Sequence, residues 1–555
     1  MYRLRGLRVR LDRISYLALA LTIPLAWVLL QGYRLDSLLL QVIGISGIVT
    51  MLIIAFIRPV IASLLRGPRV DLDLVYTLLH MRLVSSGKPP AGKVLASVSR
   101  EGMYGYYSDV FRRAVTLARE WGYNLTDALS YLAKEVGEKT FREVIQRMAA
   151  TLKLGADLEV FLDTEYDTLF HEYRYHYQRV INNMRVLLGV YIAIMAALVF
   201  ALSSFMLLGF FFGGSSRLLV QAYIVSSLVV LVLGGLIIFL LPREHFDVKG
   251  REARENPLIR LSDLLAVAGI LLSITISILY LRGKQYTPEV LGMTVALAGL
   301  PLIPAGIVAL IHESRVQDID IFFPVFIRSL GSFVQTIPSL KHAITQVLRA
   351  DLGKLTRLVM RFSSRLENEI PPHIAWKRFS IESGSELVRR GSAIFQDTME
   401  YGGDTSLAGR VISDHNNALL GLRRLRAQIS SNFTSTTIII HATVVAISIF
   451  ILGLIGYFNT ILQALLEGLT PEVASFIFIN IVDIEFLNKI IYLFIFTLTL
   501  VNSYLIAKVR PFSLRSFWIY LGILLVITGV STYLSTKAVD YVLGTMGGFE
   551  APLPG

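Results

Sequence analysis

Cysteine is absent from the 555 residues of this chain. Its absence excludes disulfide frameworks, thiolate zinc sites, iron–sulfur clusters and cysteine nucleophiles. Charged residues are also scarce, at 17% against about a quarter in average soluble proteins. The excess is apolar, because 54% of the residues are hydrophobic and the mean hydropathy is +0.60. This composition excludes a disordered chain and is typical of an integral membrane protein.

Nine apolar runs are long enough to cross about 30 Å of hydrocarbon as helices. Cleavage after an arginine-rich leader, at 18–20, would leave an apolar core of only about seven residues, the short limit for a signal peptide, so we expect the first run to be retained. The runs lie at about 15–31, 37–57, 186–212, 217–241, 262–281, 290–311, 435–458, 488–507 and 516–536. The sequence therefore predicts an all-α polytopic membrane protein with about nine transmembrane helices.

Lysine and arginine in the short loops predict the orientation of these spans. With a cytoplasmic N-terminus, the inner segments 1–14, 242–260 and 508–515 hold thirteen of these residues and the outer segments hold six. The N-terminus is therefore expected in the cytoplasm of a cell-membrane protein. An odd number of spans then places the C-terminal tail, 538–555, outside.

Two long polar stretches lie on the cytoplasmic side in this topology, and their helical periodicity predicts two small helical bundles. An interfacial or re-entrant piece is expected in the external segment. The predicted organisation is 1–57, leader and transmembrane helices 1 and 2; 58–185, first cytoplasmic bundle; 186–311, transmembrane helices 3–6 with a short cytoplasmic loop at 242–261; 312–434, second cytoplasmic bundle; and 435–555, transmembrane helices 7–9 with an external segment at 459–487 and the external tail.

The chain repeats itself at an offset of 247 residues. Asp73 and Asp320 each open an apolar helix, and Gly155–Asp157 matches Gly402–Asp404. The first and fifth predicted spans also start about 247 residues apart, as do the third and seventh. Because each unit contains four spans, an even number, the two copies share one orientation and both bundles are expected on the same side.

Short motifs in both copies resemble those of a known family. Gly-Ala-Asp-Leu at 155–158 and Gly-Gly-Asp-Thr at 402–405 each precede a long apolar span, and a Ser-Gly-x-Pro turn occupies 86–90. These elements resemble those of the type II secretion F-domain family, the membrane platform proteins of type IV pilus-like machines. The second copy departs from the pattern, because Val334 replaces the glycine of the turn. The motif corners are Gly155, Asp157, Gly402, Gly403 and Asp404, and both aspartates are expected to cap the following helix.

Nine spans with two such domains are similar to the archaeal branch of the family, which serves archaella and archaeal adhesion pili. The resemblance implies a scaffold with no catalytic residue, metal or cofactor. It implies binding of a hexameric cytoplasmic secretion ATPase and transfer of pilin-like subunits into a filament; assembly as a homodimer stays open. The alternatives are a membrane carrier or membrane-embedded enzyme of an unrelated family, and a passive anchor for the ATPase.

Two features bear on these alternatives. Gly87–Val94 fits three of the four fixed P-loop positions, but two prolines remove backbone donors and a helical pattern precedes the segment, so a helix–helix turn is expected. Carriers keep ionisable groups at bilayer depth. The middle of the predicted spans holds no Asp, Glu, Lys or Arg, and His441 is expected to be a hydrogen-bonded packing residue.

Two groups of basic residues are candidate partner surfaces in the second bundle. One lies along a single helix face, and the other lies near the expected bilayer surface. The first group, which we call the basic stripe, is Lys354, Arg357, Arg361 and Arg365, and the second is Arg423, Arg424 and Arg426. They predict either a solvated surface that touches anionic lipid headgroups or a docking site for an acidic rim of the ATPase.

Charges in the first bundle are arranged differently. The positions that correspond to the basic stripe are Tyr107, Val110, Ala114 and Ala118, and six carboxylates lie between Asp157 and Glu172. These carboxylates are expected to face solvent or a partner, although a metal site is the alternative. Net charges of +3 for the first bundle (18 basic, 15 acidic residues) and +4 for the second (16 and 12) argue against nucleic-acid binding.

Glycine recurs every seven residues in the sixth predicted span, at Gly292, Gly299 and Gly306. Small residues on one face allow two membrane helices to approach closely. Internal packing and self-association are both open uses of this face. Pro301 and Pro304 predict a kink in the same span.

Overall fold

The computed structural model describes residues 70–99, 103–211, 216–241, 256–284, 287–337, 339–467 and 484–546, with isolated positions between 20 and 51. In this part the chain is helical and contains no strand. The first half comprises α3 (Leu72–Ser85), α4 (Ala91–Ser99), α5 (Tyr106–Arg119), α6 (Leu125–Glu135), α7 (Lys139–Lys153), α8 (Leu158–Phe211) and α9 (Ser216–Leu240). The second half comprises α10 (Pro257–Leu281), α11 (Pro288–Gly299), η2 (Leu300–Leu302), α12 (Ile303–Thr336), α13 (Leu340–Val347), η3 (Gly353–Leu355), α14 (Thr356–Glu367), α15 (Pro372–Ser383), α16 (Glu386–Glu400), α17 (Thr405–Glu467), α19 (Ile484–Val509), η4 (Leu514–Ser516) and α20 (Phe517–Met546).

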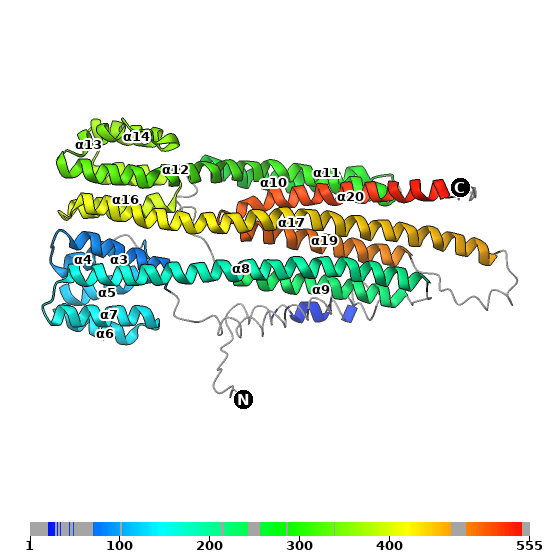
Figure 1. The fold of residues 1–555 in the computed structure, drawn as a ribbon, viewed down its shortest axis with the longest axis horizontal. Helices are drawn as coiled ribbons and strands as arrows, with labels where there is room; N and C mark the ends of the chain where they lie inside the picture. Colours follow the sequence, from blue (N-terminus) through cyan, green and yellow to red (C-terminus); the bar gives the residue numbers. More distant parts are fainter. Residues whose placement is uncertain are drawn as a thin grey trace, which may run out of the picture.

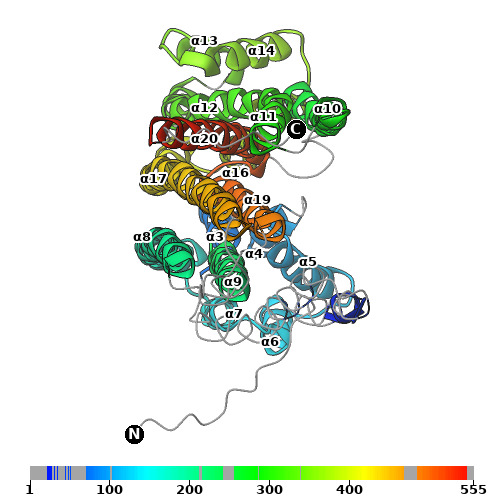
Figure 2. The same cartoon turned by 90° about the vertical axis from the view of Figure 1, so that its right-hand side faces the viewer.

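The short helices gather at one end of an elongated molecule, and the long helices run along it (Figure 1). We call α3–α7 with the N-terminal part of α8 the first bundle. The second bundle is the C-terminal part of α12, α13–α16 and the N-terminal part of α17. The two bundles lie side by side at the same end of the molecule (Figure 1), and the view along the long axis shows the helices of the second bundle above those of the first (Figure 2). A parallel repeat requires this arrangement.

Seven helices in the described part are long and apolar enough to span a membrane. They correspond to the predicted spans from 186–212 onward, whereas 15–31 and 37–57 lie largely outside the described residues. On α10, apolar side chains such as Leu264, Leu271 and Ile278 are exposed, as expected where lipid replaces water around a helix. The chain is an all-α, multi-pass membrane protein.

Three helices continue without a break from the bundles into the spans. α8 has 54 residues and α17 has 63, which correspond to about 80 and 95 Å at the usual rise per residue. Neither contains proline. The predicted boundaries after residues 185, 311 and 434 therefore fall inside α8, α12 and α17. α17 also extends beyond the span end predicted at 458, and 468–483 lie outside the described residues.

The repeat predicted from the sequence is confirmed by the helix boundaries. α15, α16 and α17 each begin 247 residues after α6, α7 and α8. α4 corresponds to α13, α5 corresponds to η3 with α14, and α3 corresponds to the C-terminal part of α12. Equivalent positions of the two bundles can therefore be compared residue by residue.

The glycine-rich sixth span packs inside the chain. A Cβ added to Gly292 would lie 2.9 Å from the Gly529 carbonyl oxygen, and one added to Gly299 would lie 2.6 Å from that of Gly522. Gly306 approaches the backbone of Ile519 in the same way. All three partners are on α20, so internal packing uses this face. The predicted kink is the 3-10 turn η2, which separates α11 from α12.

Candidate functional site

The two bundles meet where the family-like motifs of opposite copies touch. The Asp404 backbone N–H donates a hydrogen bond to the Ser86 hydroxyl at 3.0 Å. A Cβ on Gly87 would lie 2.8 Å from the Gly403 nitrogen and 2.9 Å from the Gly402 carbonyl carbon. Only glycine permits this approach without movement of the backbone. Residues 86–90 join α3 to α4, so the P-loop-like segment begins as the predicted helix–helix turn, and that turn is an inter-bundle contact.

The two Gly-x-Asp corners share one local structure. Gly155 and Gly402 have positive φ values of 67° and 73°, the usual conformation of a glycine that ends a helix. The Asp157 carboxylate accepts a hydrogen bond from the Glu159 N–H at 2.8 Å, and that of Asp404 accepts one from Leu407 at 2.9 Å. The predicted capping role is confirmed for both aspartates.

The surroundings of the two corners differ, and the sequence did not predict this difference. The corner at 402–404 packs against the first bundle. The corner at 155–157 is exposed, and the preceding Leu154 is 82% exposed. The bundles are therefore joined head to tail and not by an isologous contact.

Arg390 on α16 is buried at the centre of the inter-bundle contact. Its guanidinium lies 2.6 Å from the Asp73 carboxylate of α3 and 2.7 Å from the Glu386 carboxylate. It also lies over the Tyr76 ring, 4.8 Å from the centroid. Burial raises the pKa of Glu386, but hydrogen bonds and charge from Arg389 and Arg390 outweigh burial, so the net pKa is lowered. Sequence reasoning identified Asp73 only as a helix start and missed this ion pair.

A layer of aromatic and histidine side chains extends the contact. His80 lies 2.9 Å from the Asp397 carboxylate of the second bundle and 3.0 Å from the Tyr104 hydroxyl. The Tyr166 hydroxyl lies 2.9 Å from Nδ1 of His415, and this imidazole stacks on Phe170. Burial lowers the pKa of His415 to about 3. Neutral His415 therefore serves as a packing and hydrogen-bonding group near neutral pH.

Arg426 links α17 to the C-terminal end of α19 and to the start of the loop between α19 and α20. Its side chain is buried, at 1% exposure, and donates to the carbonyl oxygens of Val509 at 2.9 Å and Lys508 at 3.0 Å. Arg510 of the same loop pairs with Glu313 of α12 at 2.8 Å. These contacts connect the second bundle to the last two spans.

Replacing Arg426 by leucine is expected to loosen this loop, because the carbonyl groups of Lys508 and Val509 lose their donor. Hydrogen bonds to charged groups contribute about 1.5–3 kcal/mol each. We expect a lower melting temperature and faster maleimide labelling of a cysteine introduced at Phe512. Arg424→Leu is the matched control, because Arg424 is exposed. Equal labelling rates in the two variants would contradict the role of Arg426.

The basic stripe is largely paired within the chain, and three of its four residues are exposed while Arg365 is half-buried. Lys354 binds Asp318, and Arg361 and Arg365 both bind Glu382. Arg357 is exposed and makes no ion pair or hydrogen bond with the described residues. A partner could therefore bind Arg357 without breaking an ion pair between described residues, unlike the other three residues of the stripe.

The second basic group divides differently. Arg423 is buried and pairs with the buried Asp320 at 2.9 Å. Arg426 is committed to the α19–α20 loop. The structure therefore places only Arg424 of this group on the surface. The sequence could not show this, because a buried arginine and an exposed one have the same place in the helical pattern.

The carboxylates of α8 have mixed surroundings. Asp163 and Asp167 both bind Arg82 of α3, and Glu165 binds Arg147 of α7. Among the described residues, no group of three or more His, Cys, Asp or Glu side chains has an arrangement able to hold a metal ion. Part of the predicted solvent-facing run therefore holds α8 to its neighbours.

His441 lies in a polar cluster between spans. Its Nε2 lies 2.9 Å from the Thr528 hydroxyl, and its Nδ1 lies 3.3 Å from the Asn502 side chain. The Tyr191 hydroxyl donates to Asn502 at 2.6 Å. The cluster joins α8, α17, α19 and α20, and His441 is hydrogen-bonded and packed as predicted.

These features define a helical, multi-pass membrane scaffold in which two repeated bundles share one end. Residues 77–206 match the family model described as type II secretion system (T2SS), protein F. The chain therefore carries a T2SS protein F domain, and the family resemblance seen in the sequence is confirmed. The match covers the first bundle from within α3 and most of the following span, and the 247-residue repeat relates the second bundle to it.

Two curated relatives carry the name Flagella accessory protein J. The one from Methanocaldococcus jannaschii is 28% identical over 323 residues, 56% of this chain and 57% of the relative. The one from Methanococcus voltae is 25% identical over 426 residues, 72% of this chain and 75% of the relative. The match thus spans little more than half the length of the Methanocaldococcus protein. No solved structure matches the chain.

Proposed function

We propose that this protein is the membrane platform of an archaellum-type filament machine, in which it couples a cytoplasmic secretion ATPase to the insertion of pilin-like subunits. The T2SS protein F domain and the names of the two relatives support this assignment. The observation that carries the mechanism is the continuity of α8 and α17 from the bundles into the spans. A force applied to either bundle therefore acts directly on a membrane helix.

The contacts between the bundles favour movement as one unit. The close backbone approach at Gly87 and the Arg390–Asp73 ion pair join the two bundles directly. Arg426 and the Arg510–Glu313 pair extend the connection to α19 and α20. A tilt of the paired bundles would then shift several spans together, which is the movement needed to relay a subunit out of the bilayer.

The orientation follows from the charge distribution. The lysine and arginine excess in segments 1–14, 242–260 and 508–515 favours a cytoplasmic side for both bundles. On that side they face the compartment that contains ATP. The N-terminus is then inside and the C-terminal tail outside.

The exposed face of α14 and the exposed Arg424 of α17 are the proposed docking surfaces for the ATPase. We expect Arg357→Glu to lower ATPase co-purification at least tenfold, because a repulsive charge replaces a free cation in a docking contact. Among the described residues Arg357 has no ion-pair or hydrogen-bond partner to lose, so the amount of protein in the membrane should not change. Co-purification from solubilised membranes with quantitative blotting measures both quantities.

Arg119→Glu is the matched control. Arg119 is exposed on the first bundle, and its substitution changes the net charge by the same amount. Unchanged co-purification of Arg357→Glu would reject docking on α14. An equal loss in both variants would show a non-specific effect of charge. Normal filaments in a deletion strain would reject the platform assignment itself.

A further inference from the structure

Helix α8 changes character where it leaves the first bundle. Before this point it exposes carboxylates such as Asp163 and Glu172, and beyond it the exposed side chains are apolar, with Val186 65% and Phe200 76% exposed. Residues 173–185 separate the two parts, and we call them the junction segment. The segment contains three arginines and a histidine but no aspartate or glutamate. It therefore carries only positive charge, between an acidic stretch and an apolar one.

The repeat places the junction segment at the membrane surface. α8 and α17 pack against each other before and after it, through the pairs Tyr166–His415 and Tyr191–Phe433. Both pairs are separated by nearly the repeat offset, so equivalent residues of the two helices lie at similar levels. Arg179 corresponds to Arg426, which binds the end of α19 where the chain turns toward α20. A turn between two spans lies at a membrane surface, and Arg179 therefore lies there as well.

Arg179 differs from Arg426 in what it binds. The buried Arg426 donates to the backbone carbonyl oxygens of Lys508 and Val509. Arg179 is exposed and makes no hydrogen bond or ion pair with the part of the chain that the structure describes. Its guanidinium lies over the Tyr175 ring, 4.5 Å from the centroid. This stacking uses the face of the guanidinium and leaves the N–H donors at its edge for an acceptor outside the chain.

Two further side chains extend this site along α8. Asn182 and Arg185 are exposed, and Arg185 likewise has no hydrogen bond or ion pair with described residues. Arg179, Asn182 and Arg185 follow one another at intervals of three residues. Adjacent members are therefore neighbours on the helix surface, with Cβ atoms about 5–6 Å apart. Because all three carry N–H groups, we call them the donor row.

The carboxylates around the donor row are distant or already bound. Along α8, Glu172 is seven residues before Arg179, which is about 10 Å closer to the bundle. α9, and the part of α17 beside the junction segment, contain no aspartate or glutamate. At the start of α3, Asp71 caps its own helix and Asp73 is bound by Arg390. The positive charge of the row is therefore not neutralised by these neighbouring helices.

These properties select the phosphate of a lipid headgroup as the ligand. Phosphate oxygens are acceptors, and guanidinium groups bind them through paired N–H donors. Val186, one residue beyond Arg185, is exposed and can contact the acyl chain of the same lipid, which a soluble anion lacks. Tyrosine is enriched at this level of membrane proteins, and Tyr175 is 61% exposed.

We propose that the donor row binds the phosphate of an anionic lipid, with Tyr175 holding the guanidinium of Arg179 in place. The sequence pattern predicts lipid contact at the two basic groups of the second bundle, whereas this site lies on α8 of the first copy. Equivalent positions on α17 are Arg426, Ile429 and Asn432. The second copy therefore lacks the site. Lipid binding here does not depend on the proposed role in filament assembly.

A local quenching measurement on the full-length protein in lipid nanodiscs tests the proposal. Because the chain has no cysteine, Asn183→Cys accepts a single fluorophore beside the donor row. The nanodiscs consist of phosphatidylcholine with a fixed fraction of nitroxide-labelled phosphatidylglycerol or, in parallel, of nitroxide-labelled phosphatidylcholine. Each basic residue near an anionic lipid favours association about fivefold, so we expect phosphatidylglycerol to be enriched about tenfold or more at the fluorophore.

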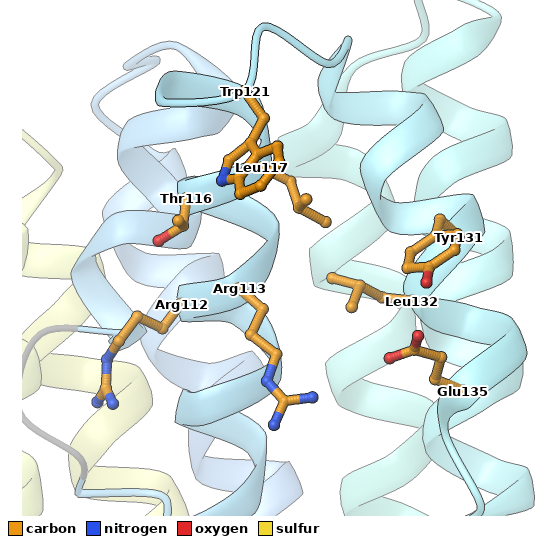
Figure 3. A pocket seen from close by; sticks show the side chains of 8 residues that line it. All are labelled: Arg112, Arg113, Thr116, Leu117, Trp121, Tyr131, Leu132 and Glu135. Atoms are coloured by element: carbon orange, nitrogen blue, oxygen red, sulfur yellow. The ribbon is translucent and has the colours of Figure 1, made fainter.

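Two double variants with equal changes in charge locate the effect. Arg179→Gln with Arg185→Gln should abolish most of the enrichment. Arg113→Gln with Arg119→Gln should preserve it, because both arginines belong to α5 of the first bundle, where Figure 3 shows Arg113 beside α6. All four arginines are exposed, so neither pair of substitutions should lower the melting temperature.

Inorganic phosphate distinguishes a lipid from a free anion as the ligand. Sodium phosphate and sodium chloride of equal ionic strength should relieve the quenching equally if the row binds a lipid. Stronger relief by phosphate would assign the row to a soluble phosphate and overturn the proposal. Equal quenching by the two labelled lipids, or equal losses of enrichment in the two double variants, would overturn it as well.

Discussion

Replacing Gly87 by alanine is expected to separate the two bundles. The new Cβ would lie 2.8 Å from the Gly403 nitrogen and 2.9 Å from the Gly402 carbonyl carbon, distances that require one backbone to move. Overpacking of a close contact costs about 1–3 kcal/mol. Because the Ser86–Asp404 hydrogen bond lies at the same point, the movement should break it as well.

A disulfide reporter measures this separation directly. The chain has no cysteine, so Ser86→Cys with Asp404→Cys provides a unique pair across the contact. We expect efficient oxidation in the parent protein and a several-fold lower yield with Gly87→Ala. Gly92→Ala is the matched control, because a Cβ at Gly92 meets nothing within 4 Å. Equal yields with the two alanines would show that the approach at Gly87 does not hold the bundles together.

If the bundles act as one unit, Gly87→Ala should also reduce filament number, whereas Gly92→Ala should not. The disulfide yield tests whether the contact forms, and filament number tests whether filament assembly needs it. A lower disulfide yield with normal filaments would confirm the contact and refute joint movement of the bundles.

Replacing Arg390 by leucine is expected to be the most destabilising single change at the inter-bundle contact. The substitution leaves Asp73 and the buried Glu386 without the charge that lies between them. Removal of one member of a buried ion pair costs about 3–5 kcal/mol. Arg389→Leu is the control, because Arg389 also binds Glu386 but is more exposed than Arg390. Thermal unfolding of the two variants in detergent measures the difference.

The pH dependence distinguishes a charge effect from a packing effect. The folded-state pKa of Glu386 is lowered, so its stabilising contribution is present above the unfolded pKa, near 4.5, and is lost as pH falls through the folded pKa. Removal of Arg390 should lower the stability most at neutral pH, and the difference from the parent protein should shrink as Glu386 becomes protonated. A difference that does not change between pH 7 and 4 would assign the loss to packing alone.

Local patterns were sufficient to predict much of this fold. Spans from 186–212 onward follow from apolar runs, because the bilayer demands about twenty apolar residues in every crossing helix. Capping at Asp157 and Asp404 depends on residues two or three positions apart. Each of these patterns involves residues that are close together in the sequence, so it can be recognised without knowledge of the tertiary structure.

The candidate sites were less predictable. Arg423, Arg424 and Arg426 are nearly adjacent and have the same chemistry, yet two are internal and one is exposed. The helical pattern assigns faces but does not reveal which neighbour covers a face.

The sequence by itself determined the class, the helical spans and the 247-residue repeat, because each follows from composition or from periodicity along the chain. Only the tertiary structure decided how the two copies meet. Ser86 and Asp404 are 318 residues apart, and Asp73 pairs with Arg390 across a similar distance in the chain. Contacts between distant residues impose no periodic pattern on a single sequence, so complementary surfaces become visible only when both copies are folded side by side.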